Sequence, residues 1–92
     1  MSGALPKVYL VRHGETAWTV SRQHTGRTDI PLSERGEHEA RDVGARLAAL
    51  RFDRILSSPL QRARRTAEIA LPGSWVEADD DLMEWDYGAY EG

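Results

Sequence analysis

Residues 7–15 read Lys-Val-Tyr-Leu-Val-Arg-His-Gly-Glu, a short apolar run that ends in a cation, an imidazole and a glycine. A nearly continuous apolar run of this length is typical of a strand buried on both faces of a parallel sheet. Gly14 permits a sharp turn directly after it. We therefore predict a strand over residues 7–11, followed by a loop that starts with chemically reactive side chains.

A loop and then a helix are predicted downstream of this strand. Residues 15–32 lose any hydrophobic period and collect turn-forming residues, which indicates a loop with at most a turn of helix near Ala17 and Trp18. Ser33 can cap the following helix, and acidic residues lie near its positive end. The apolar positions of that helix recur at helical spacing: Ala40, Val43, Gly44, Leu47 and Leu50.

The same alternation continues toward the C-terminus. Residues 52–56 form a second short apolar stretch and predict a second strand. Ser58 and Gln61 have the spacing of a capping box, which predicts a helix from Pro59 to about Ala70. Residues 75–78 predict a third strand. This order of strands and helices is that of βαβ units, so we predict an α/β fold with a parallel sheet covered by helices.

Length and composition exclude several classes of protein. With 92 residues the chain allows one domain at most, and three strands cannot complete such a sheet, so we expect the N-terminal part of a larger domain. A formal charge of −3 argues against nucleic-acid binding, and no apolar run is long enough for a membrane helix. Without cysteine there are no disulfides, thiol nucleophiles or cysteine-bound metals. We expect a soluble, cytoplasmic protein.

The segment Arg12-His13-Gly14-Glu15 follows the first predicted strand, at the edge where open α/β sheets bind their ligands. An imidazole can attack phosphorus and hold the phosphoryl group when guanidinium groups neutralise the charge on its oxygens. His13 is therefore a candidate nucleophile and Arg12 its first cationic neighbour. The alternative is an ordinary loop histidine beside a surface cation.

Arg62 and Glu84 are two further candidates. Arg62 lies in the first turn of the second predicted helix, where anions bind favourably, and it can face the same crevice as His13. Arg64 and Arg65 more simply serve as surface charges or as partners of nearby carboxylates. Glu84 lies between apolar neighbours, and such surroundings favour the protonated form that a general acid requires. The alternative for each is a structural or solvated side chain.

These motifs, taken in order, resemble those of the histidine phosphatase (phosphoglycerate mutase-like) superfamily. The resemblance covers nearly the whole chain and rests on residues 12–18, 24–36, 58–66 and 84–92. It implies a three-layer α/β/α architecture with a mainly parallel sheet, which is incomplete in this chain. Residues 1–92 are then the N-terminal part of a single histidine phosphatase domain.

The resemblance also implies roles for individual residues. His13 accepts the phosphoryl group, Arg12 and Arg62 bind the phosphate, and Glu84 donates and accepts the proton, with no cofactor and no metal. The pair Thr25-Gly26 contributes contacts near the phosphate or substrate. We add Thr19 to these contacts, although similar mutases carry asparagine there. The second catalytic histidine of the family is matched by neither His24 nor His38.

The residues around Glu84 are more similar to the acid phosphatases and sugar-phosphate phosphatases of the family than to its mutases. We therefore predict a phosphomonoester hydrolase that acts through a phosphohistidine on small phosphorylated metabolites. The alternatives are a phosphoglycerate mutase and a catalytically inactive phosphate-binding fragment. Residues 1–92 alone are expected to be inactive. The expected partner is a small phosphorylated metabolite or inorganic phosphate. Assembly into a homo-oligomer is left open by the sequence.

Overall fold

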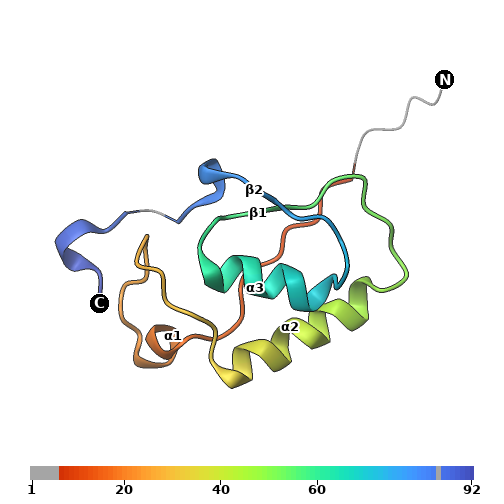
Figure 1. Ribbon diagram of the computed structural model, residues 1–92. Helices are drawn as coiled ribbons and strands as arrows, with labels where there is room; N and C mark the ends of the chain where they lie inside the picture. Colours follow the sequence, from red (N-terminus) through yellow and green to blue (C-terminus); the bar gives the residue numbers. More distant parts are fainter. Residues whose placement is uncertain (1–6, 85) are drawn as a thin grey trace.

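The computed structural model describes residues 7–84 and 86–92 of the chain. Two helices and a small two-stranded sheet form its centre, and irregular segments surround them (Figure 1). The elements in chain order are α1 (Ala17–Ser21), α2 (Glu34–Leu47), β1 (Leu56–Ser57), α3 (Gln61–Ala70), β2 (Glu77–Ala78) and two 3₁₀ turns, Asp80–Leu82 and Gly88–Tyr90.

The helix α2 begins where the sequence predicts. Ser33 is its N-cap, and the Ser33 hydroxyl accepts a hydrogen bond from the backbone N–H of Gly36 at 3.1 Å. Glu34 and Glu37 lie in the first turn, where carboxylates favour the positive end of the helix dipole. Local capping and amphipathic spacing therefore suffice to fix this helix.

The helix α3 begins two residues later than predicted, because its cap comes from another part of the chain. The expected capping box is wrong: Ser58 Oγ accepts from the N–H of Leu60 at 3.2 Å. The N–H of Gln61 donates instead to Asp29 Oδ1 at 2.7 Å, and the Gln61 side-chain amide donates to the Asp29 carbonyl at 2.9 Å. A loop carboxylate is a stronger acceptor than a local hydroxyl and sets the helix start at Gln61.

The helices α2 and α3 pack closely against each other and lie on the same side of the sheet (Figure 1). A Cβ added to Gly44 of α2 would lie 2.7 Å from the carbonyl oxygen of Ala70 in α3. Only a residue without a side chain fits this crossing. The buried hydrophobic side chains, which include Ala40, Leu60 and Ala70, belong to these two helices and the residue that precedes α3.

The sheet is parallel, as predicted, but each strand is short. Leu56 pairs with Glu77 and Ser57 with Ala78. The strands occupy only the ends of the stretches 52–56 and 75–78 that the sequence singled out. The described chain thus has the predicted α/β organisation, with a small parallel sheet and helices.

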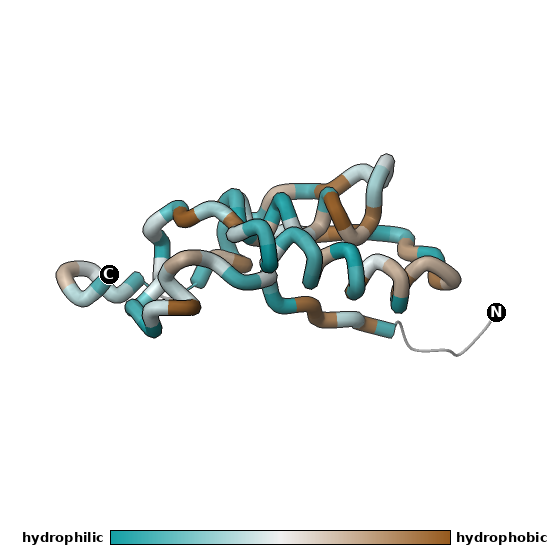
Figure 2. The backbone as a smooth tube through the Cα atoms, turned by 90° about the horizontal axis from the view of Figure 1, so that it is seen from below, coloured by the Kyte–Doolittle hydropathy of each residue, from teal (hydrophilic) through white to brown (hydrophobic). Residues whose placement is uncertain are grey.

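The prediction of a buried strand over residues 7–11 is wrong for the described structure. These residues are extended but belong to no strand, and within residues 7–84 and 86–92 no segment forms a ladder with them. Val8 is 78% exposed and Leu10 is 93% exposed. Figure 2 shows hydrophobic residues along this segment at the edge of the molecule. A strand requires hydrogen-bonding neighbours as well as an apolar sequence, and this segment lacks them.

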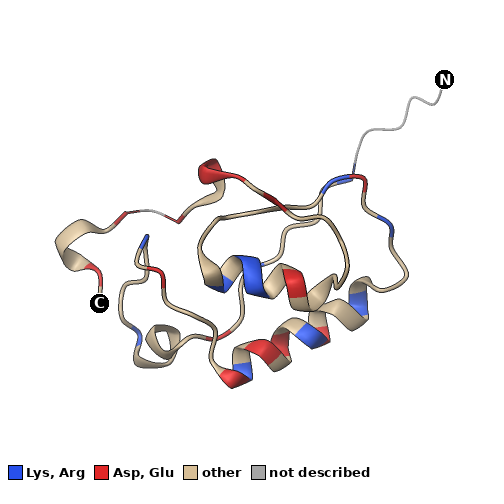
Figure 3. Ribbon diagram, in the orientation of Figure 1, with Lys and Arg blue, Asp and Glu red and all other residues tan. Residues whose placement is uncertain are grey.

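Charged residues of both signs occur along α2 and α3, and acidic residues occupy the 3₁₀ turn after β2 (Figure 3). Surface ion pairs include Arg65 with Glu37 and Arg54 with Glu77. None of the helices in the described ranges has the length and apolarity needed to cross a membrane.

Candidate active site

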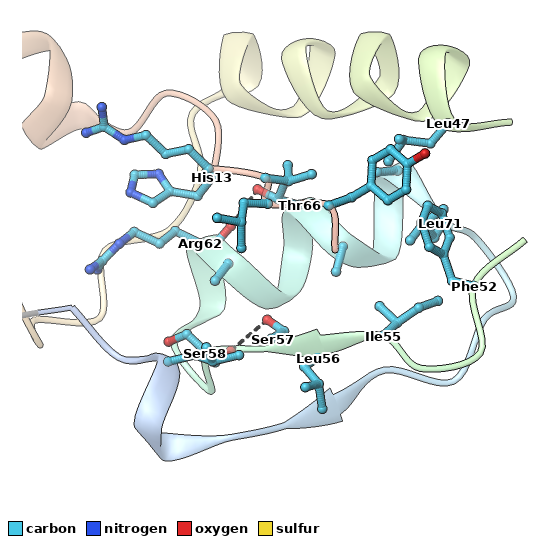
Figure 4. Close-up of a pocket in the computed structure, with 18 of the residues that line it drawn as sticks. His13, Leu47, Phe52, Ile55, Leu56, Ser57, Ser58, Arg62, Thr66 and Leu71 are labelled. Atoms are coloured by element: carbon cyan, nitrogen blue, oxygen red, sulfur yellow. Dashed lines mark hydrogen bonds between the residues drawn. The ribbon is translucent and has the colours of Figure 1, made fainter. Parts of the chain in front are cut away.

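A cavity of about 400 Å³ lies between residues 9–13 of the extended segment, the helix α3 and the residues of β1. It has two chemically different ends (Figure 4). His13, Arg62 and Ser58 lie at one end, whereas Leu47, Phe52 and Leu71 lie at the other. A ligand with a charged group and a small organic body would match this division of the cavity.

The ring of His13 is held in one orientation by its own neighbour. Nδ1 lies 2.7 Å from the carbonyl oxygen of Gly14. A carbonyl oxygen can only accept, so Nδ1 must carry the proton of a neutral ring. The lone pair of the neutral ring then resides on Nε2, the atom that can attack an electrophile. In Figure 4 the ring of His13 and the guanidinium of Arg62 extend toward the same end of the cavity.

The surroundings of His13 keep its ring neutral. Burial lowers the pKa of His13 from its ordinary value of 6.5. The hydrogen bond to the Gly14 carbonyl acts in the opposite direction, and the positive charges of Arg62 and Arg12 lower the pKa further. A neutral imidazole at neutral pH is the form that can act as a nucleophile.

The turn that follows His13 is fixed to both helices. A Cβ on Gly14 would lie 2.4 Å from the carbonyl oxygen of Gly36, so the turn touches the backbone of α2. The N–H of Gly14 donates to Thr66 Oγ1 at 3.3 Å, and that hydroxyl donates to the carbonyl of Arg62 at 2.7 Å. These contacts fix the position of His13 relative to α3.

Arg62 is buried although it carries a full charge. It is only 2% exposed, and its guanidinium donates to the carbonyl oxygens of Thr28 at 2.8 Å and Gly26 at 2.5 Å. Burial lowers the pKa of Arg62, while Glu84, Asp29 and Glu91 raise it. An arginine starts from such a high pKa that it remains protonated. The site therefore contains a positioned, permanent positive charge.

Arg12 and Glu84 complete the polar end of the cavity. Both line it, both are exposed, and both act electrostatically on His13. The negative charge of Glu84 also acts on Arg62. The apolar environment predicted for Glu84 includes Trp85, which lies outside the described residues. The structure thus brings together the four residues that the sequence singled out for catalysis and phosphate binding.

Three further predicted contacts lie outside this cavity lining. Thr19 forms a capping box with Thr16: its hydroxyl accepts from the Thr16 N–H at 2.8 Å and donates to the Thr16 carbonyl at 2.8 Å. The Thr25 hydroxyl donates to the carbonyl of Gln23 at 3.2 Å. Gly26 is buried and holds Arg62 through its carbonyl. Thr19 and Thr25 thus use their hydroxyls within the chain, and Gly26 acts on Arg62.

The remaining histidines and arginines have other environments. The ring of His24 lies 5.2 Å from that of Tyr87, and His38 is exposed on α2. Arg65 pairs with Glu37 at 3.0 Å, in agreement with the prediction that it serves as a partner of nearby carboxylates.

Sequence reasoning missed the residues that hold the candidates in place. Thr66 has a signal, because it shares a helical face with Arg62 four residues earlier. Asp29 and Glu91 belong to the stretches that carry the family resemblance, but no local spacing assigns them a role, because each contacts a segment more than 30 residues away. A contact between a carboxylate and a distant backbone N–H group produces no regular residue spacing from which it could be predicted.

Known proteins resemble this chain over nearly its whole length. A Bacillus subtilis (strain 168) protein named uncharacterized phosphatase PhoE is 47% identical over 90 residues, which cover 92% of this chain and 45% of the relative. A Salmonella choleraesuis (strain SC-B67) protein named probable phosphoglycerate mutase GpmB is 45% identical over 87 residues, covering 92% of this chain and 40% of the relative. The chain thus spans less than half the length of these relatives.

Solved structures agree with the sequence matches. The phosphoserine phosphatase of Entamoeba histolytica, solved in complex with 3-phosphoglyceric acid, superimposes with a TM-score of 0.81 at 36% identity; the match covers 87% of this chain and 40% of that protein. The family profile described as histidine phosphatase superfamily (branch 1) matches residues 8–92. The chain therefore belongs to the histidine phosphatase superfamily, which confirms the resemblance predicted from its ordered motifs.

Proposed function

We propose that this chain carries the nucleophile, the phosphate-binding arginines and the proton donor of a phosphomonoester hydrolase that acts through a phosphohistidine. The observation that carries the proposal is the fixed tautomer of His13, whose Nδ1–H donates to Gly14 beside two guanidinium groups. The three-layer α/β/α arrangement of the complete domain belongs to the same proposal.

The proposed reaction has two steps. His13 Nε2 attacks phosphorus, the bond between phosphorus and the ester oxygen breaks, and a proton from the Glu84 carboxyl passes to the leaving alkoxide. Water then attacks the phosphohistidine, its proton passes to the Glu84 carboxylate, and the P–N bond breaks to release phosphate. Arg12 and Arg62 stabilise the negative charge on the phosphoryl oxygens in both steps.

The two-ended cavity supports a small phosphorylated metabolite as the substrate. Its polar end suits the phosphoryl group, and its apolar lining suits a compact organic body. The charge on the phosphate is balanced by arginine, so we expect hydrolysis to persist in the presence of a chelator.

The experiment that tests this proposal traps the intermediate in the full-length native protein. Brief incubation with a ³²P-labelled phosphomonoester, followed by alkaline quenching, should leave label that is stable to base and labile to acid. His13→Asn should abolish that label while the circular dichroism spectrum stays unchanged. Label that persists in His13→Asn would place the nucleophile elsewhere.

A phosphoglycerate mutase is the second candidate, and the name of one relative supports it. One relative is named probable phosphoglycerate mutase, and one solved relative was crystallised with 3-phosphoglyceric acid. Incubation of the full-length protein with 3-phosphoglycerate separates the two reactions. Free phosphate as the product supports hydrolysis, whereas 2-phosphoglycerate supports transfer. A protein that binds phosphate with neither product would be a catalytically inactive phosphate-binding protein.

A further inference from the structure

The carboxylate of Glu91, in the C-terminal segment, contacts the loop of residues 26–28 that holds Arg62. It accepts hydrogen bonds from the backbone N–H of Thr28 at 2.6 Å, from the Thr28 hydroxyl, and from the backbone N–H of Arg27 at 3.2 Å. Three donors from two consecutive residues thus converge on one carboxylate from the C-terminal segment. Such convergence requires the charged, acceptor-only form of a carboxyl group.

The same loop holds the guanidinium of Arg62 from its other side. The carbonyl of Gly26 accepts from Arg62 Nη2 at 2.5 Å, and the carbonyl of Thr28 accepts from Nη1 at 2.8 Å. The peptide group between Gly26 and Arg27 is trans. A planar trans peptide directs its C=O and N–H to opposite sides. Glu91 therefore binds one side of the same peptide group whose other side binds Arg62.

We infer that Glu91 is a positioning residue, which orients the Arg62 guanidinium for phosphate through the peptide group between Gly26 and Arg27. The anion draws the Arg27 N–H toward itself, polarises the peptide and strengthens the acceptor that Arg62 uses. Arg62 donors that do not bind the loop remain for the phosphoryl oxygens, because a guanidinium has five N–H groups. This inference rests on the proposed phosphate-binding role of Arg62.

The ionisation of Glu91 agrees with this role. The hydrogen bond from the Thr28 side chain contributes most to lowering the pKa of Glu91 to about 2; the backbone N–H groups of Thr28 and Arg27 and a hydrogen bond with Asp86 act in the same direction, and burial opposes them. The carboxylate is therefore charged at neutral pH. The relay from Glu91 to Arg62 is a permanent feature of the folded protein.

The test measures binding of inorganic phosphate by calorimetry to the full-length native protein and to its Glu91→Gln variant. The substitution keeps the shape of the side chain but removes its charge and places an amide among three donors. We expect phosphate binding to weaken by about ten- to a hundredfold, as for the loss of a charge-assisted hydrogen bond. Thr28→Val, which removes only the hydroxyl donor, should weaken binding in the same direction by a smaller factor.

A double-mutant cycle separates positioning from a general loss of structure. In a protein that already carries Arg62→Lys, Glu91→Gln should change phosphate affinity less than about twofold, because the group it positions is gone. Glu77→Gln is the matched control: the Glu77 carboxylate also accepts hydrogen bonds, in its case from the Arg54 side chain, but it lies outside the cavity lining. It should leave phosphate affinity unchanged.

Two results would overturn the inference. One is unchanged phosphate affinity in Glu91→Gln. The other is an equal loss of affinity whether or not the protein also carries Arg62→Lys, which would show that Glu91 acts independently of Arg62. Failure of the proposed function looks different: the unmodified protein would then form no phosphohistidine, whatever Glu91 does.

Discussion

The turn at His13 is held by buried residues of the helices and the Arg62 guanidinium by the loop at Gly26, whereas Glu84 lies in an exposed segment whose described residues form only short 3₁₀ turns. Near His13, the backbone of Gly14 packs against that of Gly36, and the hydroxyl of Thr66 in α3 accepts a hydrogen bond from the N–H of Gly14. The groups proposed to bind phosphate are thus fixed by the fold of the described chain. Glu84, the proposed proton donor, belongs to a segment with less burial.

The largest effect is expected when residues 1–92 are studied alone. The segment 7–11 would then keep its exposed apolar side chains, including Val8 and Leu10, and no strand partner. We expect no hydrolysis of p-nitrophenyl phosphate above background, and shallow, non-cooperative thermal unfolding or self-association. Calorimetry and light scattering provide the measurements. A sharp monomeric transition together with phosphatase activity would show that the helix-held side of the site is sufficient by itself.

Glu84→Gln in the full-length protein tests the exposed side of the site. Loss of a general acid should slow phosphohistidine formation by about 10²- to 10⁴-fold for an alkyl phosphate, measured in single-turnover experiments. The loss should be much smaller for p-nitrophenyl phosphate, whose leaving group needs no proton. Asp81→Asn, in the neighbouring 3₁₀ turn, is the control and should change neither rate. Equal losses for both substrates would argue against proton donation by Glu84.

Arg62→Lys tests the buried side with the charge retained. An ammonium cannot make the planar, two-pronged contact of a guanidinium. Loss of one such contact in the transition state costs about 2 to 4 kcal/mol, or roughly 30- to 1000-fold in kcat/KM. Arg65→Lys, at an exposed position on the same helix, should stay near the unmodified rate. Near-normal kinetics of Arg62→Lys would move Arg62 from phosphate binding to a structural role.

Gly36→Ala measures how tightly the turn after His13 is packed. Alanine is favoured over glycine in a helix by about 1 kcal/mol, which alone predicts stabilisation. The new Cβ, however, would lie 2.1 Å from the carbonyl oxygen of Glu15, and backbone cannot move aside cheaply. We expect a net loss of about 1 to 3 kcal/mol in the free energy of unfolding, measured with urea.

The control for Gly36→Ala is a substitution of Gly88, in the exposed C-terminal segment. Gly88 has a φ of 56° and nothing within 4 Å of an added Cβ. Asparagine tolerates this conformation, so Gly88→Asn should change stability by less than about 0.5 kcal/mol. Stabilisation by Gly36→Ala would show that helix propensity outweighs the contact and that the turn is less rigid than the structure indicates.

The smallest effect concerns pH. The folded protein lowers the pKa of His13, so between the lowered value and 6.5 the unfolded chain binds the proton and the folded chain does not. Stability should therefore fall as the pH falls below 6.5 and should not change above it through this group. Urea unfolding at several pH values, compared between the unmodified protein and His13→Asn, isolates the contribution. If His13 instead stabilised the fold more as the pH fell, the result would contradict a neutral His13 ring.

Local signals predict some parts of this molecule and long-range contacts decide others. Helix α2 follows from Ser33 and the apolar spacing after it, since capping acts within one turn. The start of α3 depends on Asp29, 32 residues away, and could not be read from nearby residues. His13 and Arg62 were predictable because one follows an extended apolar segment at a glycine turn and the other lies in the first turn of a helix. The positions of Thr28 and Glu91 require knowledge of how the chain folds back.

Arg62 and Thr16 are the largest fully buried side chains among the described residues. Arg62 thus fills the interior and lines the cavity at the same time. Substitutions that preserve the shape of the interior but not its charge would leave a folded protein without a function. Substitutions that displace the carbonyls of Gly26 or Thr28 would leave the buried Arg62 guanidinium without these acceptors and would lower the stability of the fold. A substitution of the exposed Arg12 therefore leaves the interior intact, whereas a substitution of Arg62 changes the interior and the cavity lining together.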